Sequence, residues 1–186
     1  MLPKTNDYIK QAYKIACEHG FHKEELSVEH FLMLVITEIA EAVEADRKDI
    51  HADVLGFEER TRVHPDFTER FEAYIKDSFE DELADIYIRL CDTAGMLGIE
   101  FGEEIIDADA SNLFASLSNK KKLTDKMFAL ITVLLDDKDF GDLERIGIGL
   151  LFVEWLANEY GIDLAWHIEQ KMKYNKTRSK LHGKKY

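Results

Sequence analysis

The feature that most constrains the fold of this chain is its long helical pattern of apolar residues with few interruptions. The 186 residues include only 2 Pro and 10 Gly, which favours long helices over a turn-rich β fold. Apolar residues recur three or four positions apart over residues 6–19, 27–48, 66–96, 123–135, 143–160 and 163–178. No stretch shows a convincing strand pattern. We therefore predict an all-α helical bundle of about five to seven helices.

The length of the chain favours one domain over two. We expect a single domain over residues 1–186, with extra helical material around 105–160. Residues 49–65 are predicted to be irregular because Gly56 and Pro65 interrupt them, and residues 111–119 to form a loop or a short helix.

The formal net charge of −13 narrows the classes of partner. An acidic surface repels nucleic-acid backbones and anionic membranes, so we expect neither nucleic acid nor membrane as a partner. No apolar run follows the first lysine and no stretch is long enough to span a bilayer, so we expect a cytoplasmic protein.

Two pairs of carboxylates interrupt otherwise apolar helical patterns. Glu38 and Glu41 lie three residues apart in the second predicted helix, and Glu82 and Asp85 repeat this spacing in the third. Residues three apart share a helix face, so each pair extends a face that is otherwise apolar. Either pair alone is more often a solvated surface or an ion-pair partner. Two pairs with matching spacing favour one shared site.

Four facing carboxylates repel one another, and a hard divalent cation relieves that repulsion. Because the set contains no His or Cys, it points to Mg²⁺, or to Mn²⁺, rather than to zinc. We therefore predict that these four carboxylates are catalytic and hold the metal. Arg89, one turn beyond Asp85, is interpreted as a structural ion-pair partner of Asp85 or Asp92.

The end of the sequence is basic. Its last sixteen residues contain seven Lys or Arg and no acid. Lys171, Asn175 and Arg178 have the spacing of one helix face, so we predict that they bind the substrate, the two cations through phosphate oxygens. A cationic, frayed helix end explains Lys180, Lys184 and Lys185 equally well.

Three segments, ITEIAEAVEADR, FEDELADIYIRLCDTAG and KMKYNKTRSKLHGKKY, together resemble the all-α NTP pyrophosphohydrolases, the MazG-like superfamily. That family has a Glu-Glu-x-x-Glu helix followed by a Glu-x-x-Asp helix. Glu38 and Glu41 match the second and third glutamates of the first motif, and Glu82 and Asp85 match the second motif.

The resemblance implies Mg²⁺-dependent hydrolysis of a nucleoside triphosphate, in ribose, deoxyribose or non-standard form, to the monophosphate and pyrophosphate. It also implies a homodimer or homotetramer in which neighbouring subunits complete the site. One carboxylate, for instance Glu38, would act as the general base. Thr37 stands where the family has its first glutamate, and Glu44 is the candidate replacement.

Of two other interpretations, the sequence argues against the first and leaves the second open. A di-iron bundle needs Glu-x-x-His pairs, and none of the seven histidines has a glutamate three residues before it. A non-catalytic oligomerisation or interaction protein, binding nucleotide or metal without turnover, is the alternative. Its interface would use the aromatic residues Phe152, Trp155, Tyr160 and Trp166. Phe79, Trp155 and Tyr174 are weaker candidates for stacking on a base.

Overall fold

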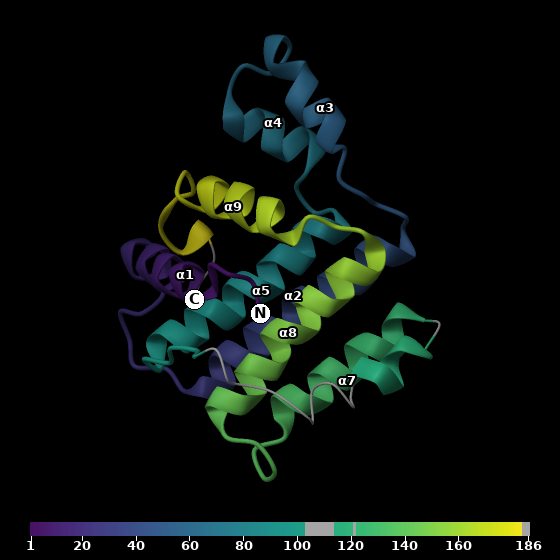
Figure 1. Ribbon diagram of the computed structural model, residues 1–186. Coiled ribbons are helices and arrows are strands. Elements are labelled where there is room, and N and C mark those ends of the chain that lie inside the picture. The colour runs from purple at the N-terminus through teal and green to yellow at the C-terminus, as the bar shows by residue number, and fades with distance from the viewer. Residues whose placement is uncertain (103–113, 121, 184–186) are drawn as a thin grey trace.

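The computed structural model describes residues 1–102, 114–120 and 122–183, except for the side chains of Arg62 and His182 (Figure 1). Eight α-helices have both ends within these residues, and no strand occurs in them, so the all-α prediction is confirmed with more helices than expected. The α-helices are α1 (Thr5–His19), α2 (Val28–Arg47), α3 (Val54–Glu59), α4 (Phe67–Tyr74), α5 (Phe79–Met96), α7 (Leu123–Leu135), α8 (Asp142–Tyr160) and α9 (Leu164–Asn175). Two 3-10 helices span Arg60–Arg62 and Lys180–Gly183. Residues 114–118 are helical too.

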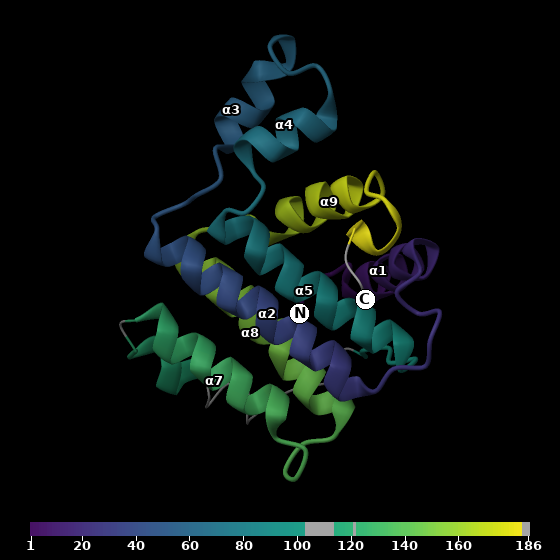
Figure 2. The ribbon, with the colours of Figure 1, turned by 180° about the vertical axis from the view of Figure 1, so that it is seen from behind.

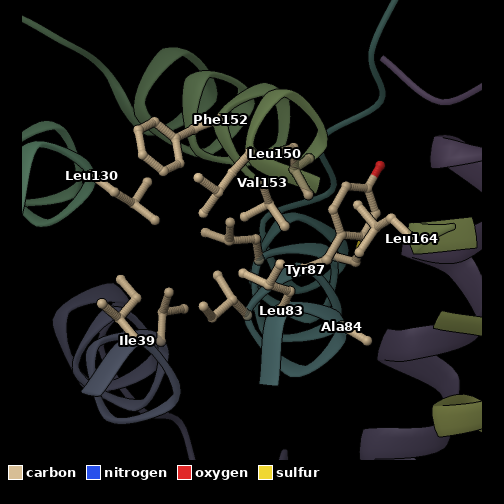
Figure 3. Close-up of a cluster of buried hydrophobic side chains, with 14 of the residues drawn as sticks. Ile39, Leu83, Ala84, Tyr87, Leu130, Leu150, Phe152, Val153 and Leu164 are labelled. Atoms are coloured by element: carbon tan, nitrogen blue, oxygen red, sulfur yellow. The ribbon is translucent and has the colours of Figure 1, made fainter. Parts of the chain in front are cut away.

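Helix α5 lies at the centre of the fold. It contacts α1, α2, α8 and α9, and it crosses the middle of the molecule in both ribbon views (Figures 1 and 2). Its Leu83 and Tyr87 side chains are fully buried in a core that also contains Leu150 and Val153 of α8 and Ile39 of α2, and the Tyr87 ring lies beside Leu164 (Figure 3). Because α5 is buried on most of its sides, the polar groups on its buried faces must find partners inside the protein.

The predicted helix 66–96 is wrong, because two helices cover it. Asp77 adopts a left-handed backbone conformation with φ of 62° between them. Ser78 then caps a new helix by accepting a hydrogen bond from the backbone N–H of Asp81. The irregular segment predicted over residues 49–65 is also wrong in part, because it contains α3 and a 3-10 helix. Part of the stretch 105–160 predicted as extra helical material, residues 105–113 and 121, lies outside the described residues.

Helices α1 and α5 approach closely at Gly95. A Cβ atom at this position would meet Cβ of Tyr13 at 2.5 Å, so only glycine lets the two helices pack at this distance. The close packing places the α1 face that carries Ala12 and Ala16 directly beside α5.

The aromatic residues considered for an interaction surface make ring contacts within the protein and differ in burial. Phe152 is fully buried and meets the ring of Trp155 at a centroid distance of 5.4 Å. Trp166 packs edge-on against Phe57 of α3. Tyr160 keeps 41% of its surface exposed. Among the described residues, no helix is both long and apolar enough to cross a membrane.

Candidate functional site

One cavity of about 310 Å³ lies between α1, α2, α5 and the end of α9. Its volume is in the range of small-molecule binding pockets. The structure brings all seven predicted site residues to its walls: Glu38, Glu41, Glu82, Asp85, Lys171, Asn175 and Arg178.

Three of the four predicted metal ligands converge in this cavity. Glu38, Glu82 and Asp85 each offer a carboxylate oxygen within 4.8 Å of the others, an arrangement that could hold a metal ion. We call these three residues the acid trio. Glu41 lines the same cavity but is exposed and lies outside the trio. The i, i+3 spacing therefore identified the right helix faces, and only one member of the α2 pair joins the α5 pair closely.

Glu82 is the member of the acid trio that most needs a cation. Only 3% of its surface is exposed, and its Oε2 atom has no hydrogen-bond partner among the described side chains. Burial, followed by the nearby charge of Asp85, raises the pKa of Glu82 to about 9. Burial and Asp85 also raise the pKa of Glu38. A buried carboxylate oxygen without a partner, close to two more, fits a hard divalent cation.

Lys171 of α9 places a positive charge against the acid trio. Its Nζ atom lies 2.6 Å from Oδ2 of Asp81 and 2.7 Å from Oδ2 of Asp85, and only 4% of the residue is exposed. Burial opposes its charged form, but Asp85 and Asp81 outweigh burial and raise the pKa of Lys171. Lys171 therefore holds Asp81 and Asp85 in place, whereas the sequence predicted a contact of Lys171 with phosphate only.

Asp81 is a site residue that the sequence analysis missed. It is buried, and burial raises its pKa to about 6 although Lys171 opposes the shift. It also belongs to a second group of close oxygens with Asp77 and Glu82. Its position four residues before Asp85, on the same helix face, was the signal that could have identified it.

Arg89 forms an ion pair, but the predicted partners are wrong. Its Nε atom donates to Oε1 of Glu38 at 3.0 Å. Asp85 is paired with Lys171 instead, and Asp92 accepts from Nε2 of His22 at 2.7 Å. The reason is tertiary, because α2 packs along α5 and brings Glu38 next to Arg89.

Glu44, the candidate to replace a carboxylate at the position of Thr37, lies outside the cavity. It forms ion pairs with Arg47 and Lys48 at the exposed end of α2 and does not line the cavity. Thr37 donates its hydroxyl to the carbonyl of Leu34. Neither residue adds an oxygen to the acid trio.

Asn175 and Arg178 line the cavity from different elements of the structure. Helix α9 ends at Asn175, three residues earlier than predicted, so Arg178 lies in the turn that follows. The Arg178 carbonyl lies 3.1 Å from Nε2 of His19, and its guanidinium lies over the Tyr174 ring. Asn175 is 7% exposed, and its Oδ1 atom has no hydrogen-bond partner in the described part of the chain. Both side chains are therefore available to a polar ligand.

The raised pKa of Glu82 predicts a pH dependence of stability in a chelating buffer. The folded protein keeps this proton to about pH 9, whereas the unfolded chain releases it near 4.5. Between these values the folded state binds more protons, so stability should fall as the pH rises. We expect the urea unfolding midpoint of the wild type to be lower at pH 8.5 than at pH 5.5.

The variant Glu82→Gln supplies the comparison for this prediction. Glutamine has no proton to lose, so the fall between the two pH values should be smaller than in the wild type. Equal falls in both proteins would contradict the assignment of the effect to Glu82.

The cavity thus combines a buried acid trio, a lysine bonded to neighbouring carboxylates, and an arginine and an asparagine at the end of α9. Such a set can hold a divalent cation at one end and place cationic and amide groups near the anion that the cation binds. No protein-family model, curated protein or solved structure matches this chain.

Proposed function

We propose that this protein hydrolyses a nucleoside triphosphate to the monophosphate and pyrophosphate with Mg²⁺, or Mn²⁺, held by the acid trio. The observation that carries the proposal is the convergence of Glu38, Glu82 and Asp85 within 4.8 Å in a cavity that Lys171 and Arg178 also line. The resemblance of three sequence segments to the MazG-like pyrophosphohydrolases supports the same activity.

The acid trio suits a magnesium triphosphate better than a bare anion. Carboxylates repel phosphate oxygens, and only a bridging divalent cation makes their approach favourable. When bound, Mg²⁺ supplies charge neutralisation of the phosphate chain and makes water more acidic. Arg178, which also lines the cavity, binds phosphate oxygens, and Asn175 contacts the sugar or phosphate through its amide.

Lys171 and Arg89 position the trio. Lys171 forms an ion pair with Asp85, and Arg89 forms one with Glu38, so a basic side chain holds each of these two ligands. Such outer contacts fix the orientation of metal ligands and typically change metal affinity or activity by 10- to 100-fold when removed.

Glu41 is the general base in this proposal, rather than Glu38. It lines the cavity, is exposed to solvent, and does not belong to the acid trio. Glu38, in contrast, is buried and accepts from Arg89. A carboxylate at the solvent side of the cavity can take a proton from an attacking water and orient it toward the phosphate.

A substrate panel tests the proposal. The full chain is incubated with Mg²⁺ and each of the common ribo- and deoxyribonucleoside triphosphates, and the products are separated by chromatography. We expect pyrophosphate and monophosphate in equal amounts. Release of orthophosphate and diphosphate would contradict the bond assignment. Nucleotide binding without pyrophosphate release would favour the non-catalytic alternative.

A further inference from the structure

One part of the cavity is lined by apolar side chains. Ala12 and Ala16 of α1, Phe21 after that helix, and Ile88 of α5 form its walls. Aliphatic and aromatic side chains of this kind can cover the faces of a flat ring. A charged triphosphate gains nothing from contact with apolar side chains, whereas the heterocyclic base of a nucleotide can pack against them.

Asp92 follows Ile88 by about one turn of α5. It is 4% exposed and lines the cavity. Nε2 of His22 lies 2.7 Å from Oδ1 of Asp92, and this contact holds the carboxylate in one orientation. The imidazole itself is stacked on Phe31 and packed against Tyr13. A buried carboxylate held this rigidly presents hydrogen-bond acceptors only.

The spacing along α5 relates Asp92 to the acid trio. Asp85 and Asp92 are seven residues apart, so both lie on one helix face, about 10 Å apart along the axis at 1.5 Å per residue. A nucleotide with its phosphates at Asp85 would span this distance with its sugar and place its base beside Asp92.

We propose that Asp92 selects nucleotides whose base carries an exocyclic amino group, an inference that rests on the proposed hydrolysis of nucleoside triphosphates at the same cavity. An amino group donates to the carboxylate, whereas a keto oxygen at the same ring position places two acceptors against each other. The substrate class is therefore cytosine, adenine or guanine nucleotides in preference to uracil or hypoxanthine nucleotides.

Two matched substrate pairs test this selection, because each pair exchanges an amino group for a keto oxygen. They are CTP with UTP and ATP with ITP. For the wild type we expect kcat/KM to favour the amino member in at least one pair by about tenfold or more. In Asp92→Asn the carboxamide can turn a donor toward a keto oxygen, so the ratio should fall to about one or reverse, with kcat/KM for the keto member maintained or increased.

The direction of the change separates recognition from loss of folding. A misfolded variant loses activity on both members, whereas an altered specificity residue shifts their ratio. Asp125→Asn is the control, because Asp125 is exposed on α7 and outside the cavity. It should leave both ratios unchanged.

Binding of monophosphates gives a readout that needs no turnover. Calorimetric titration of CMP against UMP, and of AMP against IMP, is carried out on the wild type and on Asp92→Asn. Turnover without an amino preference, or with a preference that Asp92→Asn does not move, overturns the role of Asp92 and leaves the hydrolysis intact. An Asp92-dependent preference among monophosphates without any turnover supports the base site and refutes hydrolysis. Absence of both turnover and monophosphate binding overturns both proposals.

Discussion

Replacing Asp85 with asparagine is expected to lower kcat/KM by at least about a thousandfold, since a lost metal ligand removes several kcal/mol of transition-state stabilisation. Asp85 contributes an oxygen to the acid trio and also bonds Lys171. The variant should bind Mg²⁺ more weakly, so its apparent Mg²⁺ requirement should rise together with the loss of rate. Steady-state kinetics at a series of Mg²⁺ concentrations measures both effects.

Glu41→Gln should separate the general base from the metal ligands. If Glu41 takes the proton of the attacking water, its loss lowers kcat by about 100-fold or more while the Mg²⁺ requirement stays close to that of the wild type. Glu44→Gln is the matched control, three residues further along α2, where it pairs with Arg47 and Lys48 outside the cavity. Its kinetics should equal those of the wild type.

Near-normal turnover of both Asp85→Asn and Glu41→Gln would rule out the acid trio and its neighbour as the reactive site. A raised Mg²⁺ requirement in Glu41→Gln would instead make Glu41 a fourth metal ligand, as the sequence pattern first suggested. Thermal unfolding of each variant confirms that the fold is intact before these outcomes are compared.

Helix boundaries with a clear local signal were predictable from the sequence. Ser27 caps α2 by accepting from the His30 N–H, and Gly161 ends α8 in the left-handed conformation. The apolar pattern over residues 123–135 predicted both ends of α7 correctly. In each case the residues that fix the boundary are adjacent to it in the sequence.

Boundaries without a chain breaker were not predictable. The chain leaves its helix between Tyr74 and Phe79, although no Gly or Pro lies there, and Asp77 takes the positive φ itself. The helix resumes because Ser78 caps it. A serine inside an apolar helical period is ambiguous, because the same residue also occurs within helices, so the local sequence does not decide between the two.

The candidate site was predictable as a set of helix faces and not as a set of contacts. Spacing alone pointed to Glu38 on α2 and to Glu82 and Asp85 on α5. It could not show that α9 crosses α5 and carries Lys171 onto Asp81, or that α2 pairs Glu38 with Arg89. These contacts join residues between 51 and 90 positions apart, and no local rule of the sequence specifies them.

Replacing Lys171 with methionine is expected to destabilise the protein by about 3–5 kcal/mol in a chelating buffer, the usual cost of breaking a buried ion pair by removing one partner. Methionine keeps most of the side-chain volume, so the loss isolates the charge. Most of this cost comes from leaving Asp81 without a cation, because its side chain is 1% exposed, against 20% for Asp85. Urea unfolding of the variant and the wild type at pH 8 measures the difference.

A second substitution should reverse much of this loss. In the double variant Asp81→Asn, Lys171→Met the most deeply buried carboxylate is gone together with its cation, so no uncompensated charge remains at that depth. We expect the double variant to be more stable than Lys171→Met alone. Lys176→Met is the control, since Lys176 is exposed on the turn after α9 and should change stability by less than about 0.5 kcal/mol. If Lys171→Met is no less stable than this control, the buried lysine does not compensate the acids, and the charge balance described for the cavity is wrong.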